Sequence, residues 1–156
     1  MRQFIKRFGT VLKWGTFLAT LAFIACILLQ IFARLFLTAA PSWTEEAARL
    51  FFVLAVGFAS GLALRGGDYV HFDFLVRRLS PVGRRRVLFG VDLTTAGLFL
   101  IFTVYAARFM WMGWAESSPS LKFPMAIAFA GTLILGISVS VYAVYRLGRY
   151  RSTPPQ

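Results

Sequence analysis

The sequence predicts an all-α membrane protein with four transmembrane helices, and three observations support this fold class. Of its 156 residues, 58% are apolar and only 15% are charged, whereas a soluble domain carries about 25% charged residues. The apolar residues gather in blocks that can each cross a bilayer, which takes about 20 helical residues. These blocks are apolar on all sides, unlike the alternating strands of a membrane β-barrel.

The four predicted spans cover approximately residues 14–37, 45–64, 87–114 and 124–145. Backbone polar groups inside lipid must be satisfied within the segment itself, so each span should be a helix. The first block is longer than the core of a cleaved signal peptide, about 7–15 residues, and we expect it to be retained. We expect residues 1–150 to form a single membrane domain and residues 151–156 to be a disordered tail.

The lysine and arginine residues outside the spans indicate the orientation. Thirteen of them lie at the two termini and between the second and third spans, whereas Lys122 alone lies in the other two connections. Positive charges collect on the cytoplasmic side of membrane proteins, so both termini and the middle segment should be cytoplasmic. Contact with anionic lipid is expected for the run Arg84, Arg85 and Arg86.

The start of the second span carries specific helix signals. Ser42-Trp43-Thr44-Glu45 fits a capping box, in which the serine and glutamate side chains bond first-turn N–H groups. Glu45 and Glu46 lie where the helix dipole favours anions. Glu45 and Arg49 have the i, i+4 spacing of an ion pair. These signals place the helix start close to Ser42.

Two other patterns concern helix packing and the membrane interface. Gly57 and Gly61 form a G-x-x-x-G pattern, which would let another helix approach closely but also occurs by chance in membrane helices. The tryptophans lie near predicted span ends, as in the usual aromatic belt. They are Trp14, Trp43, Trp111 and Trp114.

Five charged residues should lie near the outer ends of the first three spans. They are Arg34, Glu45, Glu46, Arg49 and Arg108. A charge within lipid costs a few kcal/mol, so such residues usually have partners. We expect one ion-pair network that ties the three spans together. Snorkelling of separate side chains and direct contact with a substrate are the alternatives.

One further acid lies near the inner end of the third span. Asp92 follows the Arg84-Arg85-Arg86 run by one and a half to two helical turns. The run is therefore the candidate partner of this carboxylate, in addition to its role as a topology signal.

The segment between the second and third spans should be a short amphipathic helix over about residues 69–80. Its apolar residues recur at i, i+3, i+4 and i+7, which is typical of a helix with one apolar face lying in the inner membrane surface. Asp73 and Arg77 have the spacing of an ion pair on another face. Ser80, followed by Pro81, can cap the helix that continues into the third span.

This segment holds the single histidine of the chain, His71. A metal site usually needs three or four ligands, and Asp68 and Asp73 are the nearby acids. One histidine and one cysteine also provide neither a bis-histidine haem site nor a nucleophile with a positioned base. We therefore expect no catalytic, metal or cofactor site.

Four motifs follow one another in a specific order and spacing along the chain. They are Gln30-x-x-x-Arg34; Trp43-x-Glu45-Glu46-x-x-Arg49; Gly67-x-Tyr69-Val70-x-Phe72-Asp73 followed by Leu75-Val76-x-x-Leu79-Ser80-Pro81; and Ser118-Pro119-Ser120-Leu121-x-Phe123-Pro124-Met125. With the four spans and their orientation, they resemble the small membrane subunit (DctQ-like) of tripartite ATP-independent periplasmic (TRAP) transporters. The resemblance covers nearly the whole chain.

The chain departs from that family's pattern at three places. The family often has a histidine where this chain has Tyr69, and His71 falls at a variable position, while Asp73 matches. Family members often carry a tyrosine and a proline within the last span, where this chain has Phe129 and Gly131-Thr132.

The resemblance implies a non-catalytic subunit without a cofactor in the bacterial inner membrane. Its partners would be a large membrane subunit, with which it forms a heterodimer, a periplasmic substrate-binding protein and membrane lipids, and not nucleic acid. The subunit would act as a scaffold, and a role in docking the binding protein is also implied, during ion-coupled uptake of small organic acids.

Two other function classes fit the sequence less well. A self-sufficient four-helix transporter would need an acid within its first span for proton coupling. The first predicted span of this chain has no acid, and its charged residue is Arg34. A membrane enzyme or electron carrier would need a cluster of ligands or a nucleophile with its base. Neither is evident.

Overall fold

The computed structural model describes residues 2–36, 41–66 and 80–152. In these ranges the chain forms the helices α1 (Arg2–Phe36), α2 (Ser42–Gly66), α4 (Pro81–Met112) and α5 (Ala126–Ser152). Each of the four is long and apolar enough to cross a membrane. The predicted all-α fold with four spans is thereby confirmed.

The helices are longer than the predicted spans. α1 begins at Arg2 instead of residue 14, α4 begins at Pro81 instead of residue 87, and α5 continues to Ser152. Hydropathy reports the part of a helix that lies in lipid, whereas backbone hydrogen bonding continues through the polar turns beyond it. Residues 151 and 152 therefore belong to α5 and not to the expected tail.

The expected amphipathic helix over residues 69–80 lies outside the described residues except for Ser80. Ser80 is the N-cap of α4, and its Oγ accepts a hydrogen bond from the N–H of Gly83 at 3.3 Å. Pro81 follows in the first turn of α4, where its missing N–H has no partner to lose. The predicted cap of this helix is confirmed.

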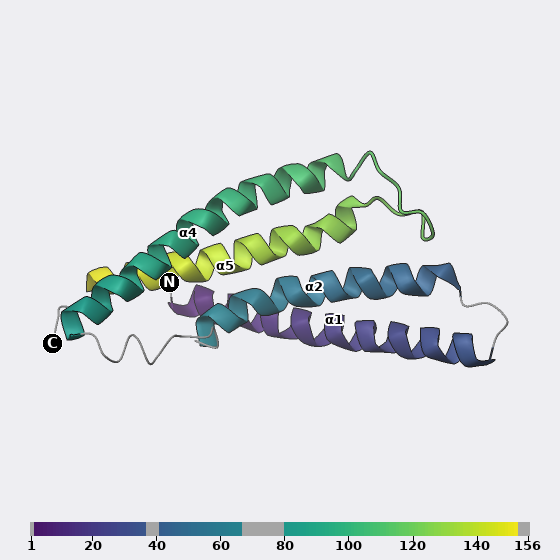
Figure 1. The fold of residues 1–156 in the computed structure, drawn as a ribbon, viewed down its shortest axis with the longest axis horizontal. Helices are drawn as coiled ribbons and strands as arrows, with labels where there is room; N and C mark the ends of the chain where they lie inside the picture. The colour runs from purple at the N-terminus through teal and green to yellow at the C-terminus, as the bar shows by residue number, and fades with distance from the viewer. Residues whose placement is uncertain (1, 37–40, 67–79, 153–156) are drawn as a thin grey trace.

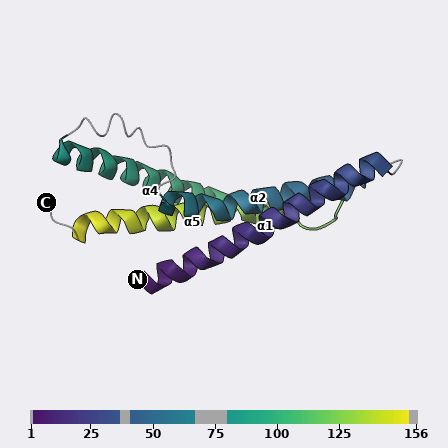
Figure 2. The same cartoon turned by 90° about the horizontal axis from the view of Figure 1, so that it is seen from below.

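The helices form one open layer in the order α1, α2, α5, α4 (Figure 1). Neighbours in this order pack on each other, whereas the backbones of α1 and α4 do not come into contact. The helices overlap in Figure 2, where the layer is seen from its α1 edge. α2 and α5 are thus the central pair, and α1 and α4 are the two edges.

The two ends of the layer differ in charge. The start of α1, the end of α2, the start of α4 and the end of α5 lie at one end (Figure 1). We call it the basic end, because those four segments hold Arg7, Arg65, Arg84 and Arg146. The opposite end, here the loop end, holds residues 113–125, which connect α4 to α5.

The central pair packs closely because small residues line the contact. A Cβ at Gly57 would lie 2.4 Å from the carbonyl oxygen of Gly131, and one at Gly61 would lie 2.6 Å from Cβ of Ser138. The Ser138 hydroxyl is buried and donates to the carbonyl of Gly57, with the two oxygens 3.2 Å apart. The helix that approaches the G-x-x-x-G pattern within this chain is therefore α5.

The early turns of α1 are held by the core at the basic end. Ile5 and Leu12 are buried together with Tyr142 of α5, and the rings of Phe8 and Tyr142 lie 5.8 Å apart. These apolar residues of α1 recur at helical spacing. This contact explains why the helix continues through the basic residues ahead of the predicted span.

Replacing Gly57 by alanine should destabilise the purified chain. The added Cβ would collide with the backbone of α5, which cannot move aside as a side chain can, and overpacking of this kind costs about 1–3 kcal/mol. Thermal unfolding in detergent, followed by circular dichroism, measures the loss.

Gly90→Ala is the matched control for this change. A Cβ at Gly90 would meet nothing within 4 Å, and alanine is the better helix former, so this variant should unfold at the same temperature or a higher one. Equal losses in both variants would contradict the close approach of α2 and α5.

Candidate functional site

The loop end carries a polar network centred on the carboxylate of Glu46 in the first turns of α2. This carboxylate accepts hydrogen bonds from the hydroxyl of Ser118 and from the backbone N–H groups of Ser120 and Leu121, the latter two at 3.0 Å and 3.1 Å. The hydroxyls of Ser42 and Ser120 lie 2.9 Å apart. Ionised acceptors make the stronger hydrogen bonds. One acid of α2 thus fixes the turn that leads into α5.

The rest of this loop is held by its own backbone. The N–H of Ser118 donates to the carbonyl of Phe123 at 2.9 Å, and the N–H of Met125 donates to the carbonyl of Glu116 at 2.9 Å. Lys122, at the tip between these bonds, has a φ of 57°, a left-handed conformation that is uncommon for residues other than glycine. The loop therefore has a defined shape, set by hydrogen bonds between its two sides and at its turn.

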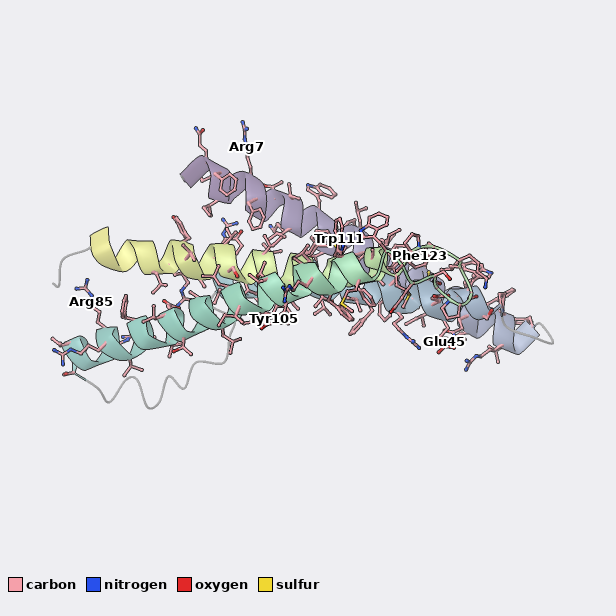
Figure 3. The ribbon with its side chains drawn as sticks, turned by 90° about the horizontal axis from the view of Figure 1, so that it is seen from above. Arg7, Glu45, Arg85, Tyr105, Trp111 and Phe123 are labelled. Atoms are coloured by element: carbon pink, nitrogen blue, oxygen red, sulfur yellow. The ribbon has the colours of Figure 1, made fainter. Side chains whose placement is uncertain are left out.

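The loop presents an exposed surface at this end of the molecule. Figure 3 shows Trp111 and Phe123 in the same half of the molecule as Glu45. Trp114 is 61% exposed, and Glu116 and Lys122 are exposed as well. Aromatic residues are enriched at surfaces that bind other proteins, and the rim of such a surface is polar.

The five outer charges do not form the single network that the sequence predicted. Glu45 pairs with Arg49 at 3.3 Å within α2, and both side chains are exposed, whereas Glu46 binds the loop. Arg34 and Arg108 are exposed, and the ion pairs in the described part of the chain do not include them. Arg34 is at the end of α1 and Arg108 on α4, two helices that do not meet. α2, which carries both acids, packs on α1 and α5 but not on α4, so its acids do not tie the three spans together.

The predicted capping box is also not formed. The hydroxyl of Ser42 is near Ser120 instead of bonding the first turn of its own helix, and Glu45 binds Arg49. Thr44, which is buried, donates its hydroxyl to the carbonyl of Pro41 at 2.7 Å. Trp43 is exposed beside it. Contact with the loop has replaced the local cap.

A second polar site lies near the basic end, where three helices meet. Nε of Arg146 on α5 lies 3.2 Å from Oδ1 of Asp92 on α4, with the side chains 29% and 3% exposed. Nη1 of the same arginine donates to the carbonyl of Leu64, in the last turn of α2, at 3.3 Å. The final carbonyls of a helix have no partner within it, so Arg146 satisfies one of them together with Oδ1 of the buried carboxylate. Oδ2 of Asp92 has no hydrogen-bond partner within the described residues.

This arrangement corrects the predicted pairing of Asp92 with the Arg84-Arg85-Arg86 run. The ion pair of Asp92 joins α4 to α5 through Arg146. Arg84 and Arg86 are exposed. The contact of Arg84, Arg85 and Arg86 with anionic lipid stays a prediction.

Two residues singled out in the sequence, Asp73 and His71, cannot be placed in the structure, because they lie outside the described residues. Within the described ranges, no three His, Cys, Asp or Glu side chains are grouped so that they could hold a metal ion.

Residues 23–152 match the family described as Tripartite ATP-independent periplasmic transporters, DctQ component. The chain belongs to this family. A search of curated proteins found no match.

Membership of the DctQ family makes this chain the small component of a TRAP transporter and, with its four apolar helices, a multi-pass membrane protein. The matched region begins within α1 and contains α2, α4, α5 and both polar sites. The Glu46 site joins two of the motifs on which the resemblance rests, the Trp43–Arg49 stretch and the Ser118–Met125 stretch. In this DctQ protein the two motifs are parts of one structural unit.

Sequence reasoning missed Ser118 and Arg146 as site residues in this DctQ protein. Ser118 was recognisable as part of a family motif, but its contact with Glu46 spans 72 residues of sequence. Arg146 was counted only as a topology signal. Arg146 and Asp92 each lie close to the cytoplasmic basic residues at one end of a predicted span, so both were expected at a similar depth. This similarity in depth was the signal that could have identified them as partners.

Replacing Glu46 by glutamine should loosen the α4–α5 loop. The amide keeps the size of the carboxylate but supplies only one oxygen as acceptor, and its NH₂ group opposes a backbone donor. We expect several-fold faster proteolysis within residues 114–123 of the purified DctQ protein. Glu45→Gln changes an exposed neighbour and should leave the cleavage rate unchanged, so equal acceleration in both variants would contradict the Glu46 contacts.

Replacing Arg146 by leucine should destabilise the protein strongly. The variant leaves Asp92 buried without a counter-charge, which costs about 3–5 kcal/mol. The double variant Asp92→Leu with Arg146→Leu removes both charges and should recover a large part of the loss. Thermal unfolding of the two variants provides the measurement, and a double variant less stable than Arg146→Leu would contradict the pairing.

Proposed function

We propose that this chain is a non-catalytic scaffold for the large membrane subunit of a TRAP transporter. It also helps to dock the periplasmic substrate-binding protein during ion-coupled uptake of small organic acids. The observation that carries the docking role is the contact of Glu46 with Ser118, Ser120 and Leu121. It gives the connection between α4 and α5 one fixed shape at the end of the layer away from the termini.

The open layer supports a scaffold more than an independent carrier. The edge helices α1 and α4 do not meet, so the described helices do not enclose a path for a solute across the membrane (Figure 1). The acid buried within the described spans, Asp92, is already neutralised by Arg146. A self-sufficient four-helix transporter, the second candidate, would need a membrane acid that is free to bind and release its coupling ion.

The orientation in this proposal has the basic end in the cytoplasm of the bacterial inner membrane. Lys6, Arg7 and Arg65 are exposed there, and Figure 3 shows Arg7 projecting from α1 away from the other helices. Cationic side chains next to a span favour the cytoplasmic side. The loop end then faces the periplasm, where the binding protein is found.

A loop of fixed shape suits a surface that must bind and release a partner repeatedly. Ordering a flexible loop on binding costs conformational entropy, and a preformed loop avoids this cost. Trp114 is the exposed aromatic residue nearest the start of the loop, and tryptophan is enriched among the residues that dominate protein–protein binding.

Transport assays in liposomes test this proposal. The large subunit and the binding protein should take up substrate only when this chain is present, and this chain alone should move none. Uptake by this chain alone would favour the second candidate.

Trp114→Ala should raise the concentration of binding protein required for half-maximal uptake, because it removes an aromatic contact from the docking surface. Trp14→Ala is the matched control, since Trp14 and Trp114 are both 61% exposed and Trp14 lies on α1, away from the loop. Equal effects of the two variants would contradict the docking role of the loop.

A further inference from the structure

A buried hydroxyl at the basic end has no hydrogen-bond partner. Tyr142 of α5 is 1% exposed, and within the described residues its hydroxyl makes no hydrogen bond. The ring packs on that of Phe8 in α1, a contact that phenylalanine would make equally well at position 142. A buried polar group without a partner is unfavourable, so the hydroxyl is a donor that a ligand could use.

The guanidinium of Arg65, in the last turn of α2, lies beside this hydroxyl. A Cβ at Gly9 of α1 would meet both Nη1 of Arg65 and, at 2.9 Å, Oη of Tyr142, so the two groups border the same point on α1. Arginine can only donate hydrogen bonds and cannot accept the hydroxyl proton. Asp92, the described acid near this end, is already in an ion pair with another residue. The two donors therefore lack an acceptor within the described residues.

Two lysines extend the positive charge along α1. Lys6 and Lys13 lie three residues before and four residues after Gly9, which is the spacing of neighbours on one side of a helix. Both lysines are exposed, and the ion pairs of the described residues include neither of them. We call these two lysines, together with Arg65 and the hydroxyl of α5 beside it, the Arg65 site.

A phosphate group matches the chemistry of the Arg65 site. Its oxygens carry negative charge and accept several hydrogen bonds at once. Arginine binds phosphate through two parallel hydrogen bonds, and lysine binds it as a point charge. A tyrosine hydroxyl can donate to a further oxygen. One phosphate would thus supply the acceptor that these donors lack.

The surface of α1 beyond the lysines indicates that the phosphate belongs to a lipid. Phe17, Ile24 and Leu28 follow Lys13 by four, eleven and fifteen residues, which keeps them on the same side of the helix. All three are exposed. Acyl chains can lie along such an apolar surface while the headgroup meets cations next to the span. A free phosphate ion would gain nothing from these side chains.

We propose that the Arg65 site binds the phosphate of an anionic membrane phospholipid. Arg65 and the two lysines contact the phosphate oxygens. Arg65 is exposed, so its side chain can shift to let one oxygen accept from the hydroxyl of Tyr142. The lipid then joins the ends of α1, α2 and α5 at a place separate from the basic run at the start of α4. The inference concerns this chain alone and does not depend on the proposed scaffold function.

Titration of the delipidated, purified chain in detergent tests the site. Short-chain phosphatidylglycerol should raise the unfolding temperature. Arg65→Gln should increase the lipid concentration for half-maximal effect by about tenfold, as expected for the loss of a hydrogen bond to a charged group. Arg7→Gln is the matched control, because Arg7 projects from α1 away from the other helices (Figure 3), and it should leave that concentration nearly unchanged. Absence of stabilisation, or equal effects of the two variants, would overturn the site.

Two other ligands identify the source of the phosphate. Inorganic phosphate and short-chain phosphatidylcholine, at the concentrations used for phosphatidylglycerol, should raise the unfolding temperature little. Equal stabilisation by inorganic phosphate would overturn the assignment to a lipid. Equal stabilisation by phosphatidylcholine would overturn the preference for an anionic headgroup.

Tyr142→Phe tests the part played by the hydroxyl. Without lipid, this variant should unfold at the same temperature or a higher one, because it keeps the ring and removes a buried group that has no partner. It should require about fivefold more phosphatidylglycerol for half-maximal effect, since one hydrogen bond to the phosphate is lost. A lower unfolding temperature without lipid, or an unchanged lipid requirement, would overturn the contact between the hydroxyl and the phosphate.

Discussion

The close approach of α2 and α5 at Gly57 is the contact on which the rest of the structure depends. The carbonyl of Gly131 occupies the space that a side chain at Gly57 would need, and the buried hydroxyl of Ser138 bonds the carbonyl of Gly57 from the facing helix. Lipid offers no hydrophobic driving force between helices, so close packing and polar contacts must hold them together. This contact sets the register of α2 on α5.

Both polar sites follow from that register. At the loop end, Glu46 of α2 reaches the turn before α5, and at the basic end Arg146 of α5 reaches the last turn of α2. Either contact would be lost if one helix moved by a single turn, about 5.4 Å. Arg146 also holds the edge helix α4 through Asp92. Contacts at three positions along their length thus hold α2 and α5 together, and the ion pair of Asp92 with Arg146 joins α4 to them.

The sequence was sufficient for the number of spans, because each apolar block is long enough to be read from composition alone. It was sufficient for the cap at Ser80, because that contact is local. It was insufficient for the partners of Glu46 and Asp92, because their partners belong to other helices and depend on which helices are neighbours. Arg34 and Arg108 show the same limit, since one network would have required the second span to lie beside both the first and the third, and α2 does not pack on α4. The sequence indicates how deep each residue lies in the membrane. The order of the helices across the layer depends on contacts between helices, such as that of Gly57.

The order of helices in the layer has a consequence for biogenesis. α1 packs on α2 and α4 packs on α5, so each half of the chain is a pair of consecutive helices whose mutual contacts are complete before the other half is needed. The first pair can therefore enter the bilayer and associate while the second is still being synthesised. The junction between α2 and α5 is then the contact that joins the two hairpins, and until it forms Gly57 and Gly61 of α2 lack the helix that packs on them.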